Sequence, residues 1–198
     1  RPGFGYRLFV RPRKQRGLSQ LRAMNVLLVR GLPGVWDGSV RYRQAEGLER
    51  RLRIQPPVAA REQDLRRFHS ADYLARVRAQ SASGEGYLDL GDTPAFPGMY
   101  EAASFVVGSV VDAIDRILSG ACRRAFVPIA GLHHARRDAG AGFCVFNDCG
   151  VAIEVLRQVH GIRRLAYVDI DAHHGDGVFY SFEEDPRLIF ADLHEDGR

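Results

Sequence analysis

The sequence lacks any apolar segment long enough to cross a membrane. Its most apolar stretch, residues 102–118, is interrupted by Asp112 and Asp115, whereas a membrane helix needs about 18 to 20 apolar residues in a row. No charged segment followed by an apolar one opens the chain in the manner of a signal peptide. We therefore expect no membrane association.

Cysteine is scarce as well. The three cysteines form no CxxC pair and no disulfide-like framework (Cys122, Cys144, Cys149), so the pattern excludes a disulfide-stapled secreted domain. A reducing compartment, the cytoplasm, is the expected location. The sequence does not determine the oligomeric state, and an oligomer stays open.

Acidic residues are missing from the start of the chain. Eight basic residues and no acid precede Asp37, a pattern that can bind nucleic acid. Because no known nucleic-acid-binding fold accompanies the charges, we favour a solvated basic leader, within a segment 1–61 that also holds the start of the domain. The first residue is Arg rather than Met, which we take as a sign of a fragment or of an unusual start.

What is present is a core-forming chain. The 198 residues are 45% hydrophobic and 26% charged, enough for one folded domain. Apolar residues at helical spacing predict helices within residues 62–77 and at 99–118, 148–159 and 178–184. Short apolar runs at 25–29, 125–129, 165–170 and 188–191 predict strands, and the run at 42–54 is expected to be a helix. Alternating strands and helices predict an α/β fold with three layers, a mainly parallel sheet with helices on both faces.

Two polar clusters follow two of the predicted strands. The first contains His133 and His134 after residues 125–129, and the second contains Asp169, Asp171 and His173 at the end of residues 165–170. Ligands of open parallel sheets bind beyond the carboxyl ends of the strands. The two clusters therefore predict one functional site.

Residues spaced by two along an extended segment project to the same side. Asp169, Asp171 and His173 would then place two carboxylates and an imidazole together, where a cation would relieve their repulsion. Oxygen and nitrogen ligands of this kind suit zinc, or manganese if more carboxylates join.

The paired histidines suit proton transfer near neutral pH. His133 and His134 can serve as general base and general acid if carboxylates orient their rings. Asp169 and Asp176 are the natural candidates for those carboxylates.

Two sequence blocks carry a family resemblance. The strings LHHARRDAGAGFCVFND and YVDIDAHHGDGVFYSF resemble the signature blocks of the histone deacetylase superfamily, which includes acetoin-utilisation proteins and acetylpolyamine amidohydrolases. The likeness covers residues 62–198, which we interpret as the amino-terminal part of a catalytic domain of this type, incomplete at its carboxyl terminus.

The resemblance implies a role for each matching position. Asp171 and His173 would bind Zn²⁺, and His133 and His134 would form the catalytic pair. Asp169 and Asp176 would support the two histidines. Gly142 and Phe143 would line an acyl-lysine channel, and Asp92 would contact the substrate at its rim. A K⁺ site would use Asp169, Asp192 and the carbonyl of Leu193.

The implied reaction is zinc-dependent hydrolysis of the acetyl amide in acetyl-lysine or an acetylated small amine. Members of the family also use a third zinc ligand, an aspartate, and a tyrosine, both downstream of the position that matches Arg198. We therefore expect the 198-residue chain to be inactive alone.

Two alternatives stay open at this point. One is an arginase-like manganese ureohydrolase, which shares the α/β architecture and a related Asp-Ala-His string. The other is a non-catalytic binding or regulatory fragment, which the basic leader suggests.

Overall fold

The computed structural model describes residues 26–29 and 52–195. The basic leader at residues 1–25 and most of the helix expected at 42–54 lie outside the described residues. Within them, none of the helices is both long enough and apolar enough to span a membrane.

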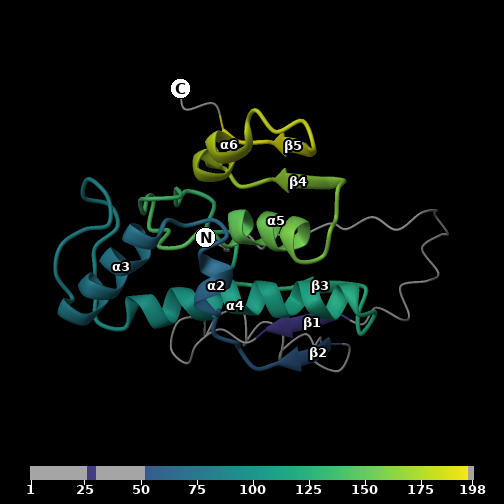
Figure 1. Cartoon of the computed structure of the whole chain (residues 1–198), viewed down its shortest axis with the longest axis horizontal. Helices are drawn as coiled ribbons and strands as arrows, with labels where there is room; N and C mark the ends of the chain where they lie inside the picture. Colours follow the sequence, from purple (N-terminus) through teal and green to yellow (C-terminus); the bar gives the residue numbers. More distant parts are fainter. Residues whose placement is uncertain (1–25, 30–51, 196–198) are drawn as a thin grey trace.

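The described strands form two parallel sheets (Figure 1). The first sheet has the order β2-β1-β3, and its strands are β1 (Val26–Val29), β2 (Leu52–Gln55) and β3 (Arg124–Phe126). The second sheet pairs β4 (Leu165–Asp169) with β5 (Leu188–Asp192). Parallel pairing agrees with the predicted sheet type, and four of the strands coincide with predicted apolar runs.

The prediction of a helix at residues 42–54 was wrong for its final part. Leu52–Gln55 is a strand that pairs with β1. Gln55 precedes Pro56, and the proline ring disfavours the helical conformation of the residue before it. Two consecutive prolines therefore end this segment in an extended conformation.

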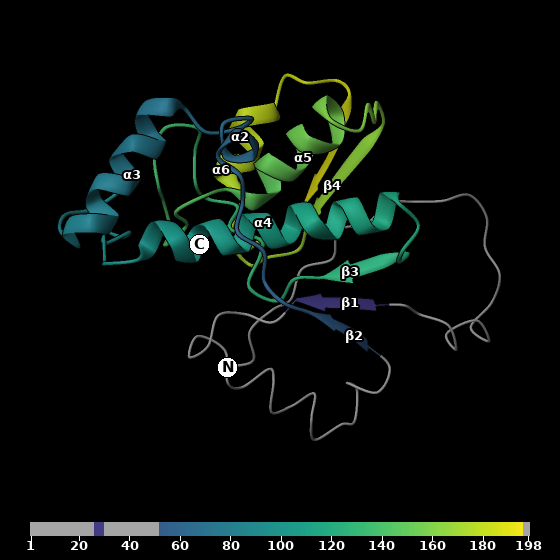
Figure 2. The same cartoon turned by 60° about the horizontal axis from the view of Figure 1, so that its bottom comes forward.

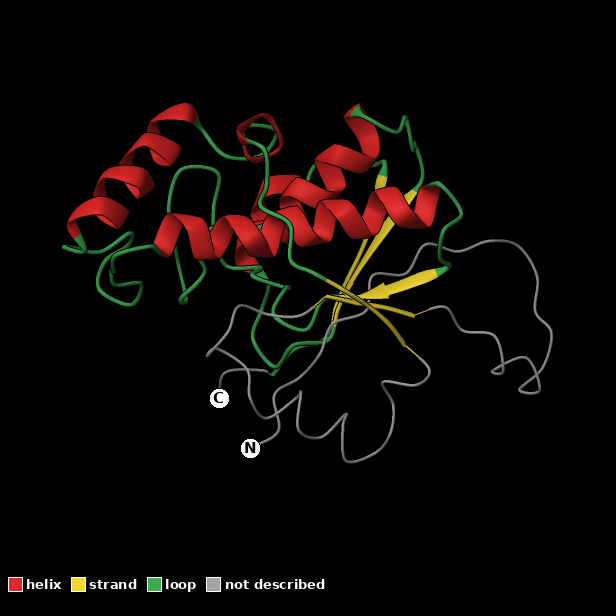
Figure 3. Cartoon of the chain, turned by 90° about the horizontal axis from the view of Figure 1, so that it is seen from below, coloured by secondary structure: helices red, strands yellow, loops and turns green. Residues whose placement is uncertain are grey.

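The predicted helices appear where the apolar spacing placed them. They are α2 (Glu62–Leu65), α3 (Ala71–Ser83), α4 (Met99–Leu118), α5 (Asp148–Gln158) and α6 (Asp176–Phe182). Helix α4 buries its apolar face, where Val107 and Ile114 are 0% and 1% exposed. Figures 2 and 3 show α4 and α5 together on one side of the strands.

The last side chain of strand β4 lies in the interior of the protein. Buried and exposed residues alternate along it, as expected for a strand with one covered face. Leu165, Tyr167 and Asp169 are buried, whereas Val168 is 42% exposed. The strand therefore ends with a buried carboxylate.

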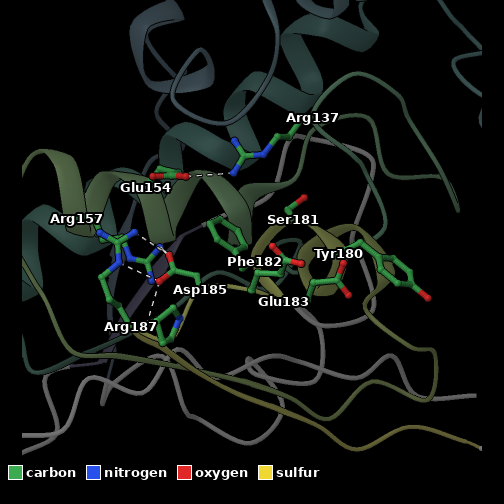
Figure 4. Close-up of a pocket in the computed structure, with 11 residues that line it drawn as sticks. Arg137, Glu154, Arg157, Tyr180, Ser181, Phe182, Glu183, Asp185 and Arg187 are labelled. Atoms are coloured by element: carbon green, nitrogen blue, oxygen red, sulfur yellow. Dashed lines mark hydrogen bonds and ion pairs between the residues drawn. The ribbon is translucent and has the colours of Figure 1, made fainter.

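A charged cavity of about 580 Å³ lies between α5 and the turn after α6 (Figure 4). Arg157 of α5 donates to Asp185 at 2.6 Å, and Arg187 donates to the same carboxylate through two nitrogens at 2.9 Å. The guanidinium groups of Arg137 and Arg157 both face the ring of Phe182. This network ties α5 to the segment between α6 and β5.

A glycine in the middle of α4 permits the close approach of the chain that follows β2. The amide of Ala60 donates to the carbonyl and the hydroxyl oxygen of Ser104, at 3.0 and 3.1 Å. A Cβ atom at Gly108 would lie 2.2 Å from the carbonyl oxygen of Val58 and 2.3 Å from the amide nitrogen of Ala60. Only glycine fits without displacing this segment.

We expect Gly108→Ala to lower the free energy of unfolding by about 1 to 3 kcal/mol, because overpacking forces the backbone apart. Urea denaturation followed by circular dichroism measures the change. Asp115→Ala, at an exposed position of the same helix, is the control and should change stability little. Equal stability of Gly108→Ala and the unmodified protein would contradict the close packing.

Candidate active site

The loop that carries the paired histidines follows β3 and is held by the first residues of α5. The carboxylate of Asp148 accepts hydrogen bonds from the amides of Gly131 at 3.0 Å and Leu132 at 2.7 Å. The side-chain amide of Asn147 donates to the carbonyl oxygens of His133 and Ala135. The Asn-Asp pair of the first sequence block thus fixes the backbone on which the histidines stand.

Helix α6 packs on the same loop from its own first turn. The amide of Val178 donates to the carbonyl oxygen of His133 at 3.1 Å. A Cβ atom at Gly177 would lie 2.4 to 2.6 Å from the carbonyl oxygens of residues 133–135. Glycine at this position lets α6 bring Asp176 up to the histidines.

His133 is buried and paired with the carboxylate at the end of β4. Its Nδ1 lies 2.6 Å from Oδ2 of Asp169, which also accepts from the hydroxyl of Tyr167 at 2.5 Å. Burial disfavours the imidazolium, but the hydrogen bond and the charge of Asp169 outweigh it and raise the pKa of His133. The pKa of Asp169 is lowered despite its burial, because His133 and Tyr167 donate to it.

His134 stands beside His133 and has a carboxylate of its own. Its Nδ1 lies 2.7 Å from Oδ1 of Asp176, and its Nε2 lies 3.2 Å from Nε2 of His133. Burial opposes the charge of Asp176, but His134 and Arg136 hold the pKa of this carboxyl below its usual range. Each histidine therefore has one nitrogen fixed by a carboxylate and the other directed at the neighbouring ring.

The two candidate metal ligands of the second block also meet. Oδ1 of Asp171 lies 2.8 Å from Nδ1 of His173 and 4.0 Å from Nε2 of His133. A carboxylate oxygen and an imidazole nitrogen at this spacing fit adjacent positions around zinc. Within residues 26–29 and 52–195, no third metal-binding side chain joins this pair.

The residues expected at the rim lie on two adjoining turns. Gly142 and Phe143 both have positive φ, 52° and 65°, at the tip of the turn that joins Ala141 to Cys144. A Cβ atom at Gly142 would lie 2.6 Å from the ring of His134, and Phe143 is 76% exposed. A glycine beside the histidine and a projecting phenylalanine therefore border the site.

Asp92 lies on a turn that is linked to Phe143. The hydroxyl of Thr93 accepts from the amide of Phe143 at 3.2 Å. The carboxylate of Asp89 accepts from the amides of Gly91, Asp92 and Thr93 and from the hydroxyl of Thr93. These bonds overcome burial and lower the pKa of Asp89 to about 2. Asp89 thus shapes the loop that presents the exposed Asp92.

The residues expected at the K⁺ site are neighbours across β4 and β5. Asp169 stands opposite Asp192 in the strand register. The amide of Leu193 donates to the carbonyl oxygen of Asp169 at 3.0 Å. The structure brings the three residues together, and their cation stays a prediction.

Several residues of the site escaped the sequence reasoning. Asp89 precedes a glycine by two positions, a signal of side-chain capping in a turn that could have identified it. Tyr167 precedes Asp169 by two positions in an alternating strand, so its side of the sheet was predictable. His69, whose Nε2 accepts from the amide of Asn147 at 3.0 Å, lies 78 residues away and gave no local signal.

Comparisons with known proteins assign the family. The model of the histone deacetylase domain matches residues 38–198. The chain is 41% identical over 152 residues to the acetoin utilization protein AcuC of Bacillus subtilis, covering 73% of this chain and 39% of the relative. It is 37% identical over 152 residues to the histone deacetylase-like amidohydrolase of Pseudomonas aeruginosa, covering 76% and 40%. The chain belongs to the histone deacetylase family.

A human relative extends the range of substrates named within the family. The chain is 36% identical over 167 residues to the polyamine deacetylase HDAC10 of Homo sapiens, covering 80% of this chain and 25% of the relative. The chain thus spans between a quarter and two fifths of the length of these three relatives.

The pairing of His133 with Asp169 gives a prediction for pH. The raised pKa of His133 means that this pair contributes its full stabilisation below about pH 6.5, the unperturbed value. The contribution is lost as the pH rises through the raised pKa. In metal-free protein, Asp169→Asn should lower the pKa of His133, which a proton NMR titration of the ring measures.

The matched control for this titration is Asp115→Asn, which removes the carboxylate paired with the remote His160 and should leave His133 titrating as before. A His133 titration that is the same in Asp169→Asn and in the unmodified chain would contradict the assigned pairing.

Proposed function

We propose that the chain carries part of the active site of a zinc-dependent deacetylase that hydrolyses the acetyl amide of acetyl-lysine or of an acetylated small amine. The observation that supports this most directly is the facing pair of histidines. Each has its own carboxylate, and both stand next to an Asp-His pair with the spacing of metal ligands.

The names of the relatives support an amide substrate. One is a histone deacetylase-like amidohydrolase and another a polyamine deacetylase. The family match favours this proposal over a manganese ureohydrolase.

Zinc would be held here by Oδ1 of Asp171 and Nδ1 of His173, together with a third ligand from outside the described residues. When bound, zinc polarises the acetyl carbonyl and makes water more acidic. Two protein ligands hold zinc less firmly than the usual three. We therefore propose that the chain of 198 residues has little activity by itself.

The two histidines divide the transfer of protons. Nδ1 of each ring is held by a carboxylate, so only Nε2 faces the space where the amide would react. One of the two histidine rings accepts a proton at Nε2 from the attacking water. The same ring or its neighbour then donates a proton to the leaving amine. The 3.2 Å separation of the two Nε2 atoms keeps both within reach of one reacting centre.

The rim residues would orient the substrate. The exposed ring of Phe143 and the adjacent Gly142 offer an apolar wall for the aliphatic part of a lysine or polyamine. Asp92 supplies a carboxylate at the entrance that can accept from a backbone amide or an ammonium group. Its exposure suits a contact made outside the reacting centre.

We also propose that the two sheets belong to one mainly parallel sheet in three layers, with helices on both faces. The support is an apolar cavity between β3 and β4, lined by residues of both strands and of α4 and α5, among them Ala125, Val168, Ala113 and Ile153. The walls of this cavity are apolar, and each of the two strands beside it belongs to a parallel sheet. The space between the two strand edges therefore suits further strands of the same sheet.

His134→Ala should lower kcat/KM by about 10² to 10⁴, because it removes a general acid-base group. Acetate release from an acetyl-lysine peptide and an acetylated polyamine is the measurement, with and without zinc, on a form as long as the relatives. His160→Ala replaces a histidine paired with Asp115 of α4 and should leave the rate unchanged. Normal turnover by His134→Ala would refute the proposed role.

Asp92→Asn should raise KM and leave kcat nearly unchanged, because Asp92 contacts the substrate away from the reacting amide. Steady-state kinetics with the peptide and the polyamine separate the two parameters. An equal loss in kcat would instead place Asp92 at the reacting centre. Asp115→Asn, a change of an exposed acidic residue in α4, serves as the control.

A further inference from the structure

A second group of potential metal ligands lies on the other side of the segment that carries Asp171 and His173. It consists of His174, from the loop after β4, Asp192, the last residue of β5, and His194. One ligand atom from each lies within 4.8 Å of those from the other two. This is the one such group of three among the residues that the structure describes, and the proposed reaction uses none of its imidazoles.

The carboxylate of Asp192 sits between the two rings. Its Oδ2 lies 2.6 Å from Nδ1 of His174, and its Oδ1 lies 3.1 Å from Nδ1 of His194. The Asp192 side chain is 7% exposed, and Oδ1 is buried without a hydrogen bond of good geometry among the described residues. A buried carboxylate oxygen in this state is costly unless a cation or donor satisfies it.

The surroundings add negative charge to this end of the sheet. Asp192 stands opposite Asp169 in the register of β4 and β5, and carboxylates directly opposite each other in a sheet repel. His133 neutralises Asp169 from the catalytic side. A cation at His174, Asp192 and His194 would neutralise Asp192 from the other side.

From these contacts we infer that His174, Asp192 and His194 form a second, structural zinc site. Two imidazole nitrogens and a carboxylate oxygen are a zinc donor set, and they leave a fourth position for water. Imidazole ligands favour a transition metal over K⁺, which prefers oxygen. The site therefore differs from the K⁺ site expected from Asp169, Asp192 and Leu193.

The existing geometry needs little change to accept the ion. Tetrahedral zinc with ligands at about 2.1 Å separates neighbouring donor atoms by about 3.4 Å, against 2.6 and 3.1 Å for the two contacts of Asp192. The rings of His174 and His194 are 4.8 Å apart between centroids, and His174 packs against Phe179. Each of these two contacts, which run to different oxygens of Asp192, would have to lengthen by less than an ångström.

A metal here would stabilise the loop that positions the catalytic residues. Asp192 already accepts from the amide of Gly175 at 3.2 Å, and the amide of Glu195 donates to the carbonyl oxygen of Ala172 at 2.9 Å. The ion would join the end of β5 to the segment between His173 and Asp176. The inference is independent of the proposed reaction.

The test begins with the double variant Asp171→Ala/His173→Ala of the whole chain, which removes the other pair of ligands. After treatment with a chelator, titration with zinc chloride in potassium chloride buffer should show one zinc bound per chain by calorimetry. Zinc should also raise the melting temperature of this variant, because it binds the folded state. Absence of zinc binding in the folded double variant would overturn the proposal.

Adding His194→Ala to the double variant should weaken zinc binding at least tenfold, since even outer-shell changes at metal sites cost about 10-fold to 100-fold. The residue is exposed, so its removal should not prevent folding, which circular dichroism checks. His160→Ala in the same background is the control for a histidine paired with an aspartate elsewhere. Equal zinc affinity with and without His194 would also overturn the proposal.

Discussion

The buried carboxylate of Asp169 is the interaction on which the candidate site depends. Its side chain is 1% exposed and accepts from the ring of His133, the hydroxyl of Tyr167 and the amide of Asp171. A buried charge is tolerated only when such donors surround it. Satisfying this one group therefore fixes the end of β4, the tautomer of His133 and the first turn of the segment that carries the metal ligands.

The N-terminal ends of two helices hold the rest of the candidate site in place. Helices α5 and α6 both start at the histidine loop, and their first turns contain Asp148 and Asp176. A carboxylate at a helix N-terminus is favoured by the helix dipole, and here each carboxylate also binds a part of the loop. Asp148 thus stabilises α5 and holds the backbone of the histidine loop, and Asp176 stabilises α6 and holds the ring of His134.

The features of the fold and of the site that the sequence could predict are those whose signal lies within a short stretch of the chain. The helical periodicity of α4 and the apolar run of β4 are local signals, and the structure confirms both elements. The strand at Leu52–Gln55 was missed because its pairing with β1 outweighs the helical spacing, and only Pro56 marked it. The group at His174, Asp192 and His194 was not predictable, because it forms only when β4 and β5 pair in their observed register.

That register explains why metal-binding side chains gather on two sides of one short segment. In the bends that follow β4, Asp171 and His173 face the histidine pair, whereas the side chain of the next residue, His174, turns toward Asp192 of β5. Parallel pairing then sets Asp169 against Asp192, and the like charges require positive partners on both sides. His133 meets this requirement on the catalytic side, and the inferred metal at His174, Asp192 and His194 would meet it on the other. A change in the charge of Asp192 would therefore be felt at Asp169, and through it at His133, without any contact with a substrate.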